Sequence, residues 1–422
     1  MAGKFRGRLP ELLHRMTEMK KPLVLHRRNW RLLLWSVVPA AFIGPGTVTT
    51  CAKAGAVYDV RLLWTLTFSM LTTFLLQEAA ARLTIATGEQ PGAVIARRLS
   101  GRTGGLLRWF LFGTVAFGCT AYQAGNILGA VAGLQQLTDL PDTWLTTGLA
   151  VFAGGLLWRG DLRHISGALA FIVFGMGILF GWVAIRTGPD PLTLFHGLAV
   201  PTIPEGGGWL VVGLIGTTVV PYSIFLTGGM AQGQDIGQMR RGLGMAILVG
   251  GLISVAVLVV GMGMEGTFSL NRLAETLSYR IDPWAGPFFA IGLFAAGFSS
   301  AVTAPLAAAV TARSILGGNH STYDGWSGES FRFRSVWSAV LVIGTGIGLS
   351  GLQPVPVILA AQALNGLLLP VVSLFLLLAV NDPLVLHPAY RNGTAANLAM
   401  GLAVAISFGL GIYNLWRVFA DG

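Results

Sequence analysis

The chain has 422 residues, of which 53% are hydrophobic and only 11% are charged, and its mean hydropathy is +0.68. A soluble domain carries about a quarter charged residues, so this composition excludes a soluble globular protein and indicates a polytopic membrane protein. The formal net charge of +10 includes a cluster before the first apolar segment, which is the placement of membrane orientation signals rather than of nucleic-acid contacts.

The N-terminal region, residues 1–31, holds nine lysines and arginines and precedes every apolar segment. We expect it to be a basic cytoplasmic tail that is attracted to anionic lipid. The apolar run that follows is too long for a cleaved signal peptide and lacks a small-residue cleavage site. The chain is therefore expected to stay anchored by its first span.

Apolar runs of about twenty residues predict eleven membrane-spanning helices and an all-α fold. The expected spans are 32–58, 61–86, 106–134, 144–158, 164–185, 208–232, 243–264, 284–315, 335–351, 354–379 and 394–417. Basic residues fall in alternate loops, such as Arg240 and Arg241, whereas 135–143 has two aspartates and no base. The positive-inside rule then predicts a multi-pass protein of the plasma (inner) membrane, with a cytoplasmic N-terminus and an external C-terminus.

Two of these spans are interrupted near their middle. Residues 44–47 (Gly-Pro-Gly-Thr) interrupt the first span, and Val220-Pro221 interrupts the sixth. Proline removes an amide donor and glycine loosens the backbone, so both helices should be discontinuous. Such backbone is tolerated at membrane depth only where protein buries it or where it lines a wet cavity, and paired breaks of this kind mark transporter substrate sites.

The positions of the breaks predict two five-helix repeats of opposite orientation, at 32–186 and 207–379, with an additional helix at 394–417. The candidate substrate-binding residues lie at the breaks: Gly44, Gly46, Thr47, Thr217, Val220, Tyr222 and Ser223. Half-helix ends present free amides and carbonyls, which could hold a zwitterion or an organic anion without fixed charges. The alternatives are a packing kink for the glycine-rich break and a core aromatic for Tyr222.

Five further polar residues within spans are candidates for coupling or gating. Lys53 could attract an anion or replace a coupling cation, or its ammonium could snorkel to the membrane edge. Glu78 and Arg82 are four apart and should form an ion pair, either structural or part of a gate. Gln123 and Asn126 are three apart on one helical face, as packing amides or as ligands.

Several segments resemble the NRAMP family of proton-coupled divalent-metal transporters. The resemblance rests on residues 44–47, 54–56, 62–64, 85–88 and 292–300, together with Gln77 and Gln362. It covers nearly the whole chain and implies the LeuT-like fold of the amino acid–polyamine–organocation superfamily.

The positions that the resemblance assigns to the metal depart from the family. The first-helix motif of the family is Asp-Pro-Gly-Asn, and its carboxylate and amide positions are Gly44 and Thr47 here. The sixth-helix alanine carbonyl and methionine sulfur, which precede Pro-His, align with Thr217 and Val220, followed by Pro221-Tyr222.

The positions that the resemblance links to proton movement depart in the same direction. An aspartate and a glutamate of the third helix align with Gln123 and Asn126, and a first-helix glutamine aligns with Lys53. A divalent cation stripped of water needs anionic oxygen, imidazole or sulfur donors, so these changes predict poor transition-metal binding.

We therefore expect a secondary transporter that works by alternating access, with a site better suited to a neutral, zwitterionic or anionic solute and a coupling ion (H⁺ or Na⁺). The alternatives are a divalent metal-ion (Mn/Mg-type) transporter using hydroxyl and carbonyl ligands, and a non-transporting sensor on the same scaffold. Cys51 and Cys119 lie in apolar segments and suggest neither a disulfide nor zinc. The sequence has no nucleophile–base arrangement, nucleotide loop or metal-spaced cluster, so no enzyme, cofactor or bound metal is expected; it does not predict the oligomeric state.

Overall fold

The computed structural model of the protein describes residues 43–160, 163–264, 266–317 and 325–420. Within these ranges the regular elements are all helices, which confirms the predicted all-α class. The basic tail at 1–31 and the first part of the span predicted at 32–58 lie outside the described residues.

Most helices follow the predicted spans, whereas the short helices at 91–98, 191–199 and 270–280 lie between them and were not predicted. The long ones are α4 (Leu63–Thr87), α6 (Gly101–Gln135), α7 (Asp142–Arg159), α8 (Arg163–Thr187), α12 (Ile236–Gly261), α14 (Ala285–Leu316), α15 (Phe331–Gly348), α16 (Pro354–Asn381) and α17 (Thr394–Ala420). The short ones are α3 (Pro45–Tyr58), α5 (Pro91–Arg98), α9 (Pro191–Ala199), α10 (Gly208–Thr218), α11 (Pro221–Met230) and α13 (Leu270–Arg280), with 3-10 turns η1 (Asp59–Leu62) and η2 (Pro388–Tyr390).

Eight helical stretches of the described chain are long and apolar enough to cross a membrane by themselves. Two of the predicted spans, α3 and α4, join through η1 into one such stretch, Pro45–Thr87. The helices α7 and α15 have 18 residues each and are absent from the eight, although both occupy predicted spans. In the part of the chain that the structure describes, each of the eleven predicted spans thus corresponds to helix, the first of them from Pro45 onward.

Proline sets where many of these helices begin. Five helices, α3, α5, α9, α11 and α16, have proline at one of their first two positions. The first turn of a helix has no internal partner for its amides, so proline's missing N–H costs nothing there and its fixed φ favours the helix. These starts can be predicted from the sequence alone.

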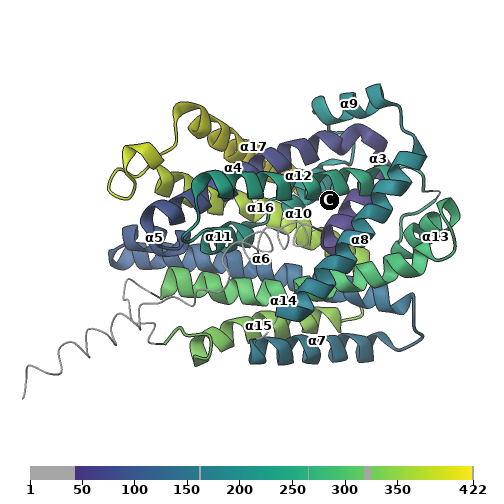
Figure 1. The fold of residues 1–422 in the computed structure, drawn as a ribbon, viewed down its shortest axis with the longest axis horizontal. Coiled ribbons are helices and arrows are strands. Elements are labelled where there is room, and N and C mark those ends of the chain that lie inside the picture. The colour runs from purple at the N-terminus through teal and green to yellow at the C-terminus, as the bar shows by residue number, and fades with distance from the viewer. Residues whose placement is uncertain (1–42, 161–162, 265, 318–324, 421–422) are drawn as a thin grey trace, which may run out of the picture.

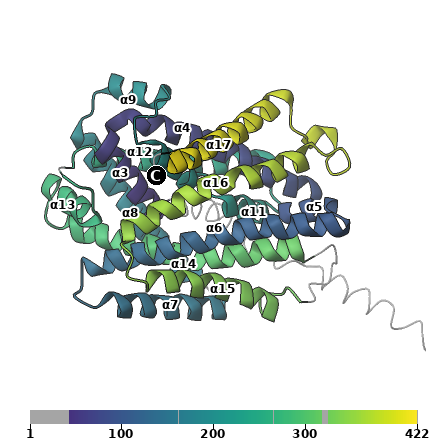
Figure 2. The ribbon, with the colours of Figure 1, turned by 180° about the vertical axis from the view of Figure 1, so that it is seen from behind.

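The core of the bundle is built around α6. This helix packs along α14 and α16, and α15 and α7 form an outer layer beside α14 and α6 (Figures 1 and 2). The helices α4 and α12 pack on the opposite side, and α3 and α10 lie between them and α16. Close approach needs small residues: a Cβ added at Gly297 of α14 would lie 2.6 Å from the backbone nitrogen of Ala130.

Candidate functional site

The sixth predicted span is broken where the sequence indicated. The helix α10 ends at Thr218, Val219 and Val220 are non-helical, and α11 begins at Pro221. In a continuous helix the amide of residue 221 would bond the carbonyl of Thr217, but proline has no N–H. The Ser223 hydroxyl donates to the carbonyl oxygen of Val220 at 2.7 Å and so covers part of the exposed backbone.

The described part of the first span begins at its break. Gly44 has an extended backbone with φ −95° and ψ 174°, and α3 starts at Pro45 directly after it. The carbonyl of Gly44 accepts the first helical hydrogen bond, from the amide of Val48 at 3.1 Å. The amino end of α3 therefore lies at the predicted position, while the half-helix before residue 43 is outside the described residues.

The two breaks meet inside the protein. The hydroxyl oxygens of Thr47 and Thr217 are 3.1 Å apart, and the two residues are only 3% and 5% exposed. The helix α16 closes over both: a Cβ added at Gly46 would lie 2.0 Å from Nε2 of Gln362, and one at Gly216 would lie 1.9 Å from the carbonyl oxygen of Gln362. We call residues 44–47 and 216–223, with the side chains that contact them, the break site.

Several residues of the break site were not among the predicted site residues. One is Thr73 of α4, whose hydroxyl donates to the carbonyl oxygen of Thr218 at 3.2 Å. The Tyr122 hydroxyl donates to the carbonyl oxygen of Gly216, and its ring meets that of Tyr222 edge-on with centroids 5.9 Å apart. Gln77 Nε2 donates to the hydroxyl of Ser223 at 2.8 Å, and Gln362 contacts Gly46. Gln77 and Gln362 carried part of the family resemblance, and an amide in an apolar span is the signal that could have selected them; Tyr122 gave no such signal.

Gln123 and Asn126 occupy different surroundings from Tyr122. Gln123 packs against α15, since a Cβ added at Gly344 would lie 2.4 Å from its Cγ. Within the described residues, both side-chain polar atoms of Gln123 and the amide nitrogen of Asn126 are buried without a hydrogen-bond partner. Buried amides without partners are costly, and a coupling role for these two residues stays a prediction.

Glu78 and Arg82 form part of a larger ionic cluster. Glu78 accepts from Arg82 Nε at 3.1 Å and from Arg240 of α12 at 2.8 Å. Arg82 in turn donates to the carbonyl of Tyr390 and, at 2.6 Å, to Oδ1 of Asn392. We call these five residues the charge cluster; it joins α4, α12 and the segment between α16 and α17.

Two other charged groups lie near the ends of helices. Lys53 is half-buried in α3, six residues beyond Thr47, and makes no ion pair among the described residues. Asp382, just past the end of α16, pairs with Arg98 of α5. Desolvation acts to raise the pKa of Asp382, but the hydrogen bond from Arg98 contributes to a net lowering below its usual range.

The break site contains hydroxyl, amide and carbonyl groups but little fixed charge. Among the residues that the structure describes, no group of three or more His, Cys, Asp or Glu is placed to hold a metal ion.

Comparison with known proteins identifies the family. Residues 36–417 match the family model of the natural resistance-associated macrophage protein-like (Nramp) proteins. The chain belongs to the Nramp family. Similar proteins include the divalent metal cation transporter MntH of Deinococcus radiodurans, 27% identical over 67% of this chain and 68% of the relative. MntH of Acidiphilium cryptum is 26% identical over 97% and 96%.

Solved structures agree at the level of the fold. A crystal structure of the Eremococcus coleocola manganese transporter matches with a TM-score of 0.70 and 18% identity, covering 92% of this chain and 87% of that one. This likeness confirms the predicted LeuT-like fold. This Nramp chain is thus a multi-pass membrane transporter, and its family is one of transporters rather than enzymes.

Proposed function

We propose that this Nramp protein is a secondary transporter that moves a divalent metal cation by alternating access around the break site. The contact between the Thr47 and Thr217 hydroxyls carries the proposal, because it brings the two helix breaks together in a buried position. Family membership and the divalent-cation relatives supply the substrate class. The coupling ion would be H⁺ or Na⁺.

The proposed ligands are hydroxyl and carbonyl oxygens. The Thr217 carbonyl has no helical hydrogen-bond donor, because residue 221 is proline and lacks an N–H. The carbonyl end of α10 also carries the negative end of the helix dipole. Hard cations such as Mn²⁺ and Mg²⁺ accept neutral oxygen ligands and retain part of their water shell. The site would therefore favour a partly hydrated hard cation over a soft one.

This proposal reverses the order of preference that the sequence indicated. The missing carboxylate and sulfur ligands predicted a non-metal solute, and the comparisons give that substrate no support while they favour the metal alternative. The prediction of a non-metal solute gave little weight to the neutral oxygen atoms that a broken helix can offer to a cation. The sensor alternative has no observation in its favour.

A neutral, zwitterionic or anionic solute remains the second candidate, because one observation favours it. The described part of the break site holds no acidic group, and the helix amino ends of α3 and α11 point their positive dipoles there. Lys53 on α3 would add an ammonium group toward the mouth of the site, about nine ångström further along the helix.

The test is uptake into proteoliposomes that contain the purified protein. We expect saturable uptake of Mn²⁺ or Mg²⁺, and Thr217→Val should weaken apparent affinity by about tenfold because it removes an oxygen ligand worth about 1.4 kcal/mol. The matched control is Thr345→Val, whose hydroxyl bonds the carbonyl of Leu341 within α15, at 2.7 Å, and should leave uptake unchanged.

Three outcomes decide between the candidates. Equal uptake by the wild type and Thr217→Val would contradict the role of the break site in metal binding. Absence of saturable metal uptake, together with a rise in melting temperature on adding amino acids or organic acids, would favour the second candidate. In that case Lys53→Gln should weaken binding of the solute by about thirtyfold or more.

A further inference from the structure

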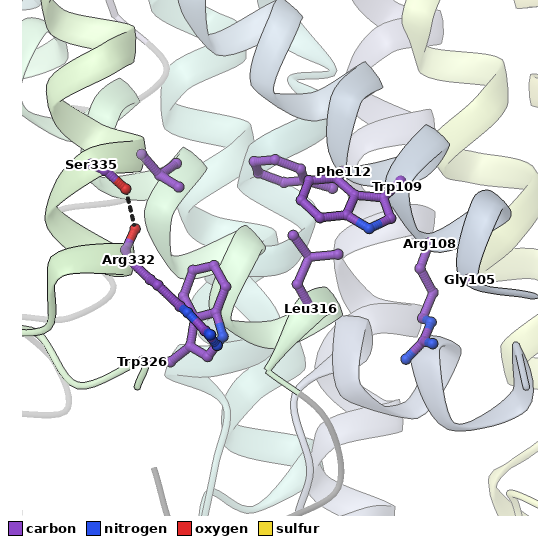
Figure 3. Close-up of a pocket in the computed structure, with 9 residues that line it drawn as sticks. Gly105, Arg108, Trp109, Phe112, Leu316, Trp326, Arg332 and Ser335 are labelled. Atoms are coloured by element: carbon purple, nitrogen blue, oxygen red, sulfur yellow. Dashed lines mark hydrogen bonds between the residues drawn. The ribbon is translucent and has the colours of Figure 1, made fainter. Parts of the chain in front are cut away.

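A pocket separate from the break site lies where α6 and α15 begin and α14 ends. Its volume is about 530 Å³, and Arg108, Trp109, Phe112, Leu316, Trp326 and Arg332 contribute to its lining (Figure 3). We call it the basic pocket. Its lining comes from three segments far apart in the sequence, so the folded bundle creates it.

The lining is divided into a basic end and an apolar end. Arg108 of α6 and Arg332 of α15 each lie four residues before an apolar lining residue, Phe112 and Val336 respectively. Residues four apart share a helical face, about 6 Å along the axis, so both arginines lie one turn nearer the start of their helices. In Figure 3 the two arginines flank the pocket from opposite sides and Leu316 lies between them.

The two arginines of the basic pocket, Arg108 and Arg332, form no ion pair with another residue that the structure describes, whereas the neighbouring Arg97 pairs with Glu89 at 2.8 Å. Another nearby arginine is held by a ring, since Arg334 lies 4.1 Å from the centroid of Trp158. A second cavity of about 310 Å³ shares Arg108 with the basic pocket and is also lined by Arg97.

The surroundings of the pocket place it at the edge of the membrane. Large apolar side chains at and beside the pocket are exposed: Trp109, which lines it, is 61% exposed, and the neighbouring Phe110 and Phe331 are 54% and 86% exposed. Such exposure is normal against lipid, and tryptophan beside arginine is typical of the interface between hydrocarbon and headgroups. This end of the bundle is the one that the positive-inside rule assigns to the cytoplasm, where anionic lipids attract basic residues.

We propose that the basic pocket binds one anionic phospholipid. Its phosphate lies between the guanidinium groups of Arg108 and Arg332, which are suited to bidentate phosphate contacts. Its acyl chains run from there over Phe112 and Val336 into the hydrocarbon. A soluble phosphate would use only the basic end, so the apolar end of the lining selects a lipid.

The test measures lipid binding independently of transport, so its failure and that of the proposed function are distinguishable. The purified protein is delipidated in detergent and titrated with phosphatidylglycerol, phosphatidylcholine or inorganic phosphate, with bound lipid counted by native mass spectrometry and folding followed by melting temperature. We expect phosphatidylglycerol to bind at least about tenfold more tightly than phosphatidylcholine, since a charge-assisted contact is worth about that factor.

Variants of the two arginines test whether the preference for phosphatidylglycerol arises in the basic pocket. Arg108→Gln with Arg332→Gln should abolish the preference for phosphatidylglycerol, whereas the matched control Arg241→Gln, whose side chain bonds only the carbonyl of Gly237 among the described residues, should retain it. If the double variant fails to fold, the single variants Arg108→Lys and Arg332→Lys should each reduce the preference, because lysine cannot make the bidentate contact.

Two results would overturn the proposal. One is an unchanged preference in a folded double variant. The other is stabilisation by inorganic phosphate equal to that by phosphatidylglycerol, which would identify a free anion as the occupant.

Discussion

Thr47 and Thr217 are 170 residues apart in sequence and share one hydrogen bond. Nothing local in either segment requires this contact; it exists because Gly46 and Gly216 allow α3 and α10 to approach α16 at Gln362. At the scale of single residues, the break site therefore depends on the absence of side chains as much as on the hydroxyls themselves.

Gly216→Ala tests this dependence on close packing. The new methyl group would lie 1.9 Å from the carbonyl oxygen of Gln362 and 2.5 Å from the amide of Gly366, both backbone atoms that cannot turn aside. Overpacking of this kind costs about 1–3 kcal/mol, so the melting temperature of the purified protein should fall. Gly409→Ala is the control, because its Cβ would meet no atom within 4 Å; equal melting temperatures of the two variants would contradict the packing argument.

The sequence predicts the backbone features of the break site better than it predicts the side chains that contact them. Gly44, Pro45 and Pro221 act through local backbone geometry, so the helix starts at Pro45 and Pro221 were predictable. Tyr122 gave no signal in the sequence, and Gln77 could be noticed only as an amide in an apolar span. Their hydrogen bonds to Gly216 and Ser223 were not predictable, because these depend on how distant helices rotate against each other.

At the scale of helices, the charge cluster links elements by polar contacts in addition to the apolar core. The side chain of Glu78 is 11% exposed and that of Arg82 is 8% exposed, whereas that of Arg240 is 53% exposed. The spacing of Glu78 and Arg82 predicted their contact, but Arg240 and Asn392 come from other helices or loops and could not be inferred. The cluster fixes α4 against α12 and the α16–α17 segment, and its role in gating stays a prediction.

Glu78→Gln should destabilise the protein by about 3 kcal/mol, because it leaves Arg82 as a buried cation without its carboxylate. The matched control is Glu89→Gln: that carboxylate pairs with Arg97, both side chains are about a third exposed, and loss of such a pair costs about 0–1 kcal/mol. Thermal unfolding in detergent at low salt would measure both. A smaller loss for Glu78→Gln than for Glu89→Gln would show that the cluster does not hold the helices together.

At the scale of the whole molecule, contacts between loops agree with the predicted alternation of sides. The sequence assigns the loops after α4, after α11 and after α16 to the cytoplasm, and the structure joins them through Arg82, Arg240, Asn392 and the Arg98–Asp382 pair. On the opposite side, Trp64 at the start of α4 donates to the carbonyl of Thr202 at 2.8 Å and so links α4 to the segment between α9 and α10. The alternation of the loops could be predicted because hydropathy and charge act over whole segments. The orientation of the protein in a membrane stays a prediction.

Cysteine labelling in intact cells tests that direction. The two native cysteines, Cys51 and Cys119, are fully buried, so a membrane-impermeant maleimide should label the wild type poorly. Thr138 lies exposed in the loop between α6 and α7, and Ser327 lies exposed in the loop between α14 and α15. Because the positive-inside rule places arginine-rich loops in the cytoplasm, Thr138→Cys should be labelled in intact cells and Ser327→Cys only after permeabilisation. The permeabilised sample controls for reactivity, since both variants should then be labelled.

Labelling of Ser327→Cys but not of Thr138→Cys in intact cells would show that the protein has the opposite orientation. The basic pocket would then lie in the external leaflet rather than beside the anionic lipids of the cytoplasmic leaflet.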